Sequence, residues 1–172
     1  MTLKSMLVAL LLILTGCTGI PKGITPVDGF EVERYLGKWY EIARLDHRFE
    51  RGLINVTAHY SPRESGGITV VNRGYDPVEN KWKEAVGKAF FIEEPDIGRL
   101  KVSFFGPFYA AYNIIELDKD EYSYAMVCGH SLSYFWILAR QKHMDQETLA
   151  DLVNKAYEMG FNVEELIYVK QE

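Results

Sequence analysis

The amino-acid sequence predicts an all-β protein: an eight-stranded antiparallel up-and-down β-barrel with one C-terminal α-helix packed outside and a short final strand. Short runs rich in β-branched and aromatic residues recur at spacings of about 10 to 15 residues, and turn-forming residues separate them. A helical period follows these runs and does not alternate with them, so parallel βαβ units are not expected. A meander of eight strands removes its exposed edges by closing into a barrel.

The strands are predicted from alternation and from the turn formers that bound each run. Leu100, Val102 and Phe104 face one side of their strand, and the polar residues between them face the other. Pairs such as Asp76-Pro77 interrupt the runs and favour turns. The eight expected strands are residues 37–45, 53–60, 67–75, 81–92, 99–105, 108–117, 122–128 and 134–141.

The chain after the eighth strand has the period of a helix. Apolar residues recur at helical spacing from Leu149 to Tyr157, which predicts an amphipathic helix with one face on the barrel. Asp145 is suited to cap the start of this helix, and Gly160 is suited to end it. The apolar run that follows predicts the last strand near residues 165–170.

The N-terminus has the features of a bacterial lipoprotein signal. Lys4 precedes an apolar run that is too short to span a membrane, which needs about 20 residues, and this pattern is typical of a signal peptide over residues 1–16. Residues 14–17, Leu-Thr-Gly-Cys, resemble the lipobox, which implies that Cys17 is acylated. Thr18 follows instead of aspartate, so the resemblance implies the outer membrane and its periplasmic face. A plain signal peptide with an incidental cysteine is the alternative.

Residues 17–35 contain Pro21, Pro26 and three glycines, so we expect a lipidated N-terminus and a tether there, with the folded domain at residues 36–172. The formal net charge is −5, and no cluster of Lys and Arg occurs, which argues against nucleic acid as a partner. The second of the two cysteines, Cys128, is expected to be a buried free thiol.

Topology brings two side chains together at one end of the expected barrel. The first strand begins, and the eighth strand ends, at the same end, and the two strands become neighbours when the barrel closes. Trp39 and Arg140 should therefore meet there, and a guanidinium over an indole face contributes about 0.5–2 kcal/mol. Gly37 leaves room at this crowded end. The pair would close this end of the barrel.

The segments GKWYEIAR, DHRFERG, KVSFFGPFYAAYN and YFWILAR resemble the lipocalin family, in particular its bacterial outer-membrane lipoproteins, which are related to apolipoprotein D. Gly37-x-Trp39 and Arg140 match the hallmark motifs of that family. The resemblance extends from about Tyr35 to Val169. It implies a barrel that holds a small apolar ligand in a cup, closed at the end where these motifs lie.

Large apolar residues that face inward are the candidate ligand contacts. Trp136 and Leu138 share the parity of Arg140 and should line the wall above it. The complete set is Phe91, Val102, Phe104, Tyr112, Trp136 and Leu138. Arg48 and Arg51 lie on the expected open-end loop and are candidates to contact a carboxylate or phosphate head group. Alternatively, they solvate the loop or pair with Glu50.

These observations predict a lipid carrier without catalysis, which stores or transports fatty acids or lysophospholipids at the outer membrane. The alternative is a structural or interaction lipoprotein whose packed barrel binds a protein. A homodimer is compatible with the sequence, but no feature of the sequence decides it.

No enzyme, cofactor or metal is expected. Residues 129–133, Gly-His-Ser-Leu-Ser, resemble a lipase nucleophile elbow, but a strand is expected to follow them where the elbow requires a helix. The four histidines show no close pairing, and Cys128 has no cysteine partner for a metal site.

Overall fold

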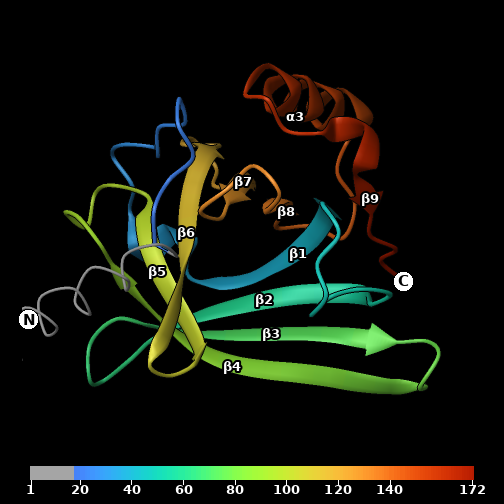
Figure 1. The fold of residues 1–172 in the computed structure, drawn as a ribbon, viewed down its shortest axis with the longest axis horizontal. Helices are drawn as coiled ribbons and strands as arrows, with labels where there is room; N and C mark the ends of the chain where they lie inside the picture. The colour runs from blue at the N-terminus through green and yellow to red at the C-terminus, as the bar shows by residue number, and fades with distance from the viewer. Residues whose placement is uncertain (1–17) are drawn as a thin grey trace, which may run out of the picture.

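A closed barrel of eight antiparallel strands with a helix on its outside forms the body of the protein (Figure 1). The computed structural model describes residues 18–172, so the expected signal peptide and the acylation of Cys17 lie outside the described residues. The strands are β1 (Gly37–Arg44), β2 (Ile54–Pro62), β3 (Ile68–Asp76), β4 (Lys81–Phe91), β5 (Arg99–Phe105), β6 (Phe108–Leu117), β7 (Tyr124–Cys128), β8 (Phe135–Ala139) and β9 (Ile167–Tyr168).

Strand β1 closes the barrel because it pairs with β2 on one side and with β8 on the other. Gly37 lies opposite Tyr60 of β2, and Tyr40 lies opposite Ala139 of β8. Every other consecutive pair from β2 to β8 is antiparallel, so the predicted up-and-down barrel is confirmed. The short strand β9 pairs with the end of β1, as an addition to the eight barrel strands.

A bulge in β1 decides which of its side chains face the interior. The register with β8 shifts between Glu41 and Ala43, so Glu41 and Arg44 lie on the same face although they are three residues apart. Ile42 and Ala43 both face the helix side instead. A regular strand would have alternated these side chains across the sheet.

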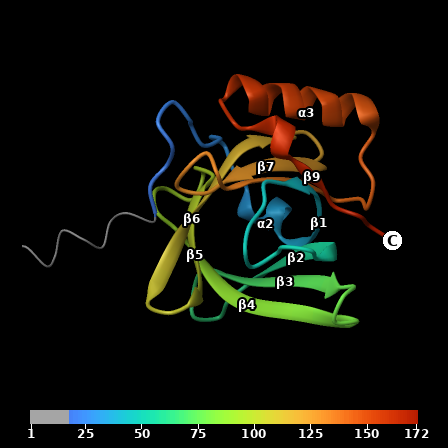
Figure 2. The same cartoon turned by 45° about the vertical axis from the view of Figure 1, so that its right-hand side comes forward.

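Helix α3 (Gln146–Glu158) covers the outer face of β7, β8 and β1 (Figure 2). The Asp145 side chain accepts hydrogen bonds from the backbone N–H groups of Glu147, at 2.9 Å, and of Thr148, and Gly160 follows the helix with φ +91°. The predicted helix and its two ends are therefore confirmed. Leu152 and Ala156 are buried in a cluster between helix and barrel, whereas Tyr157 of the predicted apolar face is exposed. No helix of the described chain is both long and apolar enough to cross a membrane.

The segment expected to be a tether packs against the barrel over much of its length. The backbone of Val27 accepts a hydrogen bond from Gly98 and donates one to Ile114, at 2.8 and 2.9 Å. Phe30 donates to Asp96, and the short helix α2 (Val32–Tyr35) then lies inside the ring of strands (Figure 2). Proline and glycine indicate irregular backbone correctly, but irregular backbone can still be bound to a sheet. The free length before the barrel is thus shorter than the sequence pattern suggested.

Candidate ligand-binding site in the barrel

The floor of the barrel is formed by an arginine on an indole. The Cζ of Arg140 lies 4.0 Å from the centre of the Trp39 ring, and Trp39 is fully buried. The indole N–H donates to the carbonyl of Tyr35 at 2.8 Å, and the guanidinium donates to the carbonyl of Lys38 at 3.0 Å. At Gly37, φ is +93°, a conformation that favours glycine, while an added Cβ would make ordinary contact with Arg140 Nη1 at 3.4 Å.

The six apolar residues expected to line the wall all belong to the cluster inside the barrel. Leu138 is buried, and the other five are partly buried and packed against the cluster. They come from four of the eight barrel strands, β4, β5, β6 and β8. The structure therefore brings the predicted wall residues Phe91, Val102, Phe104, Tyr112, Trp136 and Leu138 together.

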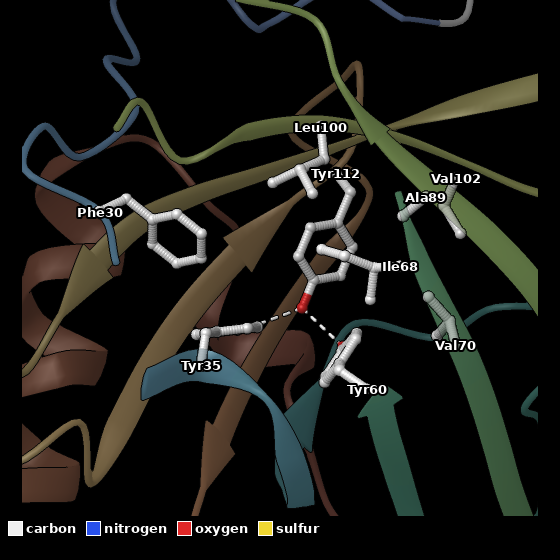
Figure 3. A pocket seen from close by; sticks show the side chains of 9 residues that line it. All are labelled: Phe30, Tyr35, Tyr60, Ile68, Val70, Ala89, Leu100, Val102 and Tyr112. Atoms are coloured by element: carbon white, nitrogen blue, oxygen red, sulfur yellow. Dashed lines mark hydrogen bonds between the residues drawn. The ribbon is translucent and has the colours of Figure 1, made fainter. Parts of the chain in front are cut away.

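An enclosed apolar space lies among these walls, and Tyr35 of α2 is one of the residues that line it (Figure 3). The volume of this cavity is about 10 Å³. The space is therefore narrow, with room for about one water molecule. Val102 and Tyr112 of the predicted set line it, and the other lining residues are Phe30, Tyr35, Tyr60, Ile68, Val70, Ala89 and Leu100.

Sequence reasoning missed those seven residues, two of which lie outside the expected strands and five of which lie within them. Phe30 and Tyr35 lie in the segment that was expected to be a tether, so they were not considered as wall residues. The strand residues could have been found, because Ile68 and Val70 share one parity in β3 and Leu100 shares that of Val102 in β5.

Three tyrosine hydroxyls meet inside the space (Figure 3). The hydroxyl of Tyr112 lies 2.7 Å from that of Tyr35 and 2.7 Å from that of Tyr60. Burial raises the pKa of all three phenols, so they remain neutral at pH 7. Three hydroxyl protons share two hydrogen bonds within the triad, which leaves one O–H group able to donate elsewhere. The triad is thus a polar group in an otherwise apolar wall.

A charged cluster occupies the interior nearer the open end. Arg44 is 1% exposed, and its guanidinium donates to Glu41 at 2.7 Å and to the backbone carbonyl of Glu50 at 2.8 Å. The Glu50 carboxylate accepts a hydrogen bond from the Trp136 indole at 3.0 Å. Burial raises the pKa of both carboxyl groups, and Glu50 raises that of Glu41 further. The guanidinium therefore pairs directly with the Glu41 carboxyl group and acts on the Glu50 carboxyl group only through its charge, where little water enters.

The loop between β1 and β2 folds onto this cluster through a buried histidine. His47 stacks on Tyr134, with ring centres 5.1 Å apart, and lies 4.6 Å from the Trp136 ring. Burial lowers the pKa of His47 to about 4, so the imidazole is neutral at pH 7. The side chain of Trp136, a predicted ligand contact, is therefore held by Glu50 and His47 at the edge of the open end.

The two arginines predicted as head-group contacts lie on the outside of this loop. Arg51 donates to Asp46 at 2.8 Å, so the expected alternative of a pair with Glu50 is wrong. Arg48 is exposed. The arginine that enters the barrel is Arg44. Strict alternation along β1 would have placed its side chain on the outer face of the barrel. The bulge between Glu41 and Ala43 is the feature that sequence reasoning could not supply.

The serine-containing connection after β7 is a turn that leads into a strand. The hydroxyls of Ser131 and Ser133 lie 2.8 Å apart, and β8 begins at Phe135, so the helix that a nucleophile elbow needs does not follow. Cys128 is a buried free thiol, as expected, and burial raises its pKa to about 12. Within residues 18–172, no group of three or more His, Cys, Asp or Glu side chains is arranged to hold a metal ion.

An eight-stranded up-and-down barrel, closed at one end by an arginine on a tryptophan, defines the lipocalin class of fold. The family model of the Lipocalin-like domain matches residues 30–171. The chain is 51% identical over 160 residues to the "Outer membrane lipoprotein Blc" of Vibrio cholerae, which covers 93% of this chain and 94% of that protein. The chain therefore belongs to the lipocalin family, whose members generally carry small hydrophobic ligands.

More distant proteins agree with this assignment. "Apolipoprotein D" of Mus musculus is 29% identical over 151 residues, which are 84% of this chain and 78% of that protein. The solved structure of Per a 4, a major allergen from cockroaches, matches with a TM-score of 0.69 over 90% of this chain and 96% of that chain. At 19% identity, this structural likeness concerns the fold alone.

Proposed function

We propose that the barrel binds lipids with an acyl tail, either fatty acids or lysophospholipids, and stores or carries them at the outer membrane. The observation that carries this proposal is the apolar and aromatic inner wall around an enclosed space, above the floor of Trp39 and Arg140. A barrel of eight strands is wide enough to hold one small ligand. The work is done by desolvation of the tail, and no catalytic step is part of the proposal.

The energetics of tail burial agree with a carrier of moderate affinity. An acyl chain that loses roughly 300 Å² of surface to the barrel gains about 7 kcal/mol before costs. Immobilisation of the chain reduces this gain, and so does the narrow space, since partly buried side chains such as Phe91 and Phe104 must move aside. A dissociation constant of about ten micromolar or weaker is therefore the expected result.

The location of the protein is proposed from the N-terminus and from the names of its relatives. Cys17 in a lipobox-like sequence is proposed to be acylated and to anchor the protein at the outer membrane, facing the periplasm. Relatives that are 50–53% identical over 151 residues carry the name "Outer membrane lipoprotein Blc", which supports this location.

One observation favours a second candidate function. The volume of the enclosed space is only about 10 Å³. A barrel that stays packed in this way would serve as a structural or interaction lipoprotein, which binds a protein partner through its outer surface.

Two neighbouring positions on β5 distinguish the candidates. Val102 lines the enclosed space, and Lys101 is directed to the opposite face of the same strand. The measurements are native mass spectrometry of the purified protein and displacement of a fluorescent fatty acid. We expect bound lipid in the wild type, an affinity at least about tenfold lower in Val102→Phe, and no change in Lys101→Phe. A persistently empty barrel without displacement would support the packed alternative.

A further inference from the structure

Large apolar side chains are exposed on all four connections at the open end of the barrel. In an up-and-down barrel, the connections β1–β2, β3–β4, β5–β6 and β7–β8 lie at the same end. Phe105 and Phe108 at the tip of the β5–β6 hairpin are 81% and 73% exposed, and Val78 between β3 and β4 is 92% exposed. We call the following residues the mouth patch: Phe49, Val78, Phe105, Phe108 and Leu132.

The opposite end of the barrel has a different character. The connections at residues 61–67, 92–98 and 118–123 contain no exposed large apolar residue in the described chain. Seven acidic residues stand against two basic ones in these connections: Glu64, Glu93, Glu94, Asp96, Asp118, Asp120 and Glu121 against Arg63 and Lys119. An anionic surface would repel this end, whereas exposed apolar groups on a rim mark a surface that meets a partner.

The course of the N-terminal segment identifies the partner. The Asn113 amide donates to the carbonyl of Gly19 at 3.3 Å and to the carbonyl of Gly129, at the start of the β7–β8 connection, at 3.2 Å. Gly19 is therefore held beside the open end. The described chain begins one residue earlier, at Thr18, and so it starts close to the same end. A chain acylated at Cys17 would enter the lipid on the side where the mouth patch is exposed.

We propose that the open end of the barrel rests on the surface of a lipid bilayer, with the mouth patch inserted at the boundary between head groups and acyl chains. Apolar groups that insert into this boundary gain by burial while the backbone stays in the polar layer. Exposed Arg48 on the β1–β2 loop, and Lys101 beside the base of the β5–β6 hairpin, add attraction to anionic lipids. The surface is separate from the barrel cavity, so the proposal holds whether or not the interior carries a ligand.

Vesicle binding by the unacylated chain of residues 18–172, which contains every described residue, tests the proposal. The vesicles contain phosphatidylethanolamine and phosphatidylglycerol at a ratio of about 3:1. We expect the double variant Phe105→Ser/Phe108→Ser to bind about a hundredfold more weakly, roughly tenfold for each phenylalanine. The control Tyr157→Ser/Tyr168→Ser removes two exposed aromatic residues from the face of α3 and β9, and should bind within about twofold of the wild type.

A second measurement reports which surface enters the bilayer. In separate variants, tryptophan replaces Phe108 or Tyr157, and brominated lipids quench its fluorescence in addition to that of the native tryptophans. Added quenching at position 108 and none at position 157 is the expected result. All four substituted positions are exposed, so each variant is expected to fold, and circular dichroism checks this.

Three outcomes would overturn the proposal. In the first, the unacylated chain shows no binding to the vesicles. In the second, the hairpin variant and the control variant lose binding equally. In the third, the hairpin variant changes the sedimentation mass of the protein without changing vesicle binding, because the mouth patch would then join two copies of the chain. Each of these outcomes leaves lipid binding inside the barrel undecided, so the two proposals can fail separately.

Discussion

An arginine lies in each half of the barrel, and the two are balanced by different groups. At the closed end, Arg140 covers the Trp39 ring and donates to backbone carbonyls, with Lys38 O at 3.0 Å and Tyr122 O at 3.3 Å. Near the open end, Arg44 is almost fully buried and binds the carboxylate of Glu41. The arginine at the closed end thus has neutral partners. In the open half, the arginine lies among ionisable groups whose charges affect one another.

The difference teaches how each end responds to change. The partners of Arg140 are carbonyl dipoles and an aromatic face, so this end should be insensitive to pH in the physiological range. The cluster of Arg44, Glu41 and Glu50 combines one cation with two carboxyl groups whose pKa values burial raises, so its energy should depend on protonation. The floor is expected to act as a fixed structural element, and the cluster as an adjustable one.

The largest expected effect is at the floor. Trp39→Ala removes a fully buried ring from the closed end, and should lower the free energy of unfolding by about 3–5 kcal/mol. Urea denaturation followed by circular dichroism measures this loss. Trp82→Ala is the matched control, because Trp82 is 48% exposed on β4, and it should cost less than about 1 kcal/mol. Equal losses in the two variants would contradict the role assigned to the floor.

The charged cluster should show the next largest effect. Arg44→Met leaves Glu41 and Glu50 buried without their cation, and should cost about 3 kcal/mol at pH 7. Adding Glu41→Gln to this variant removes one of the uncompensated carboxyl groups, and should restore part of the stability. Arg48→Met on the exposed side of the adjoining loop is the control, with an expected change within about 0.5 kcal/mol. A double variant less stable than Arg44→Met would argue against charge compensation.

The smallest expected effect concerns the histidine that holds the loop. The pKa of His47 falls from an ordinary value of 6.5 to about 4, so the unfolded chain binds more protons than the folded one between these values. The stability that His47 contributes is therefore complete above pH 6.5 and is lost as the pH falls toward 4. The full shift corresponds to about 3 kcal/mol, which solvent screening of the imidazole reduces to about 2 kcal/mol.

His47→Phe keeps a stacking ring without a titrating group, and tests this prediction. Urea denaturation at pH 7, 5 and 4 compares the variant with the wild type. Both proteins contain Glu41 and Glu50, whose effect on the pH dependence of stability is opposite to that of His47. Their raised pKa values favour folding at acid pH, with stability declining as the pH rises above about 4.5. The variant should lose less stability on acidification than the wild type does. Identical pH profiles would show that the imidazole stays accessible to protons.

Local patterns in the sequence predicted most of the elements of the fold. Alternation predicted strands whose observed ends differ by at most two residues, and one such difference is at β7, which begins at Tyr124 where residue 122 was expected. There the Asp118 side chain accepts hydrogen bonds from the backbone N–H groups of Asp120, Glu121 and Ser123, and Tyr122 has φ +54°. This turn consumes residues that an apolar run alone would assign to the strand.

The candidate site was only half predictable. The wall residues of β4, β5, β6 and β8 followed from parity, because a regular strand alternates its faces. The charged cluster did not follow, since one inserted residue near Ile42 turns Arg44 inward. The head-group candidates Arg48 and Arg51 were placed on the correct loop, but the structure holds Arg51 on Asp46 outside the barrel.

By itself, the sequence determined the strands, the capped helix and the meeting of Trp39 with Arg140, because these depend on local periods and on the order of neighbouring strands. Only the tertiary structure decided that Phe30 and Tyr35 line the cavity, that Arg44 lies inside, and that the space among the walls is narrow. These features arise from contacts between segments far apart in the chain and from a bulge of one residue. Neither leaves a periodic signal in the residues that take part.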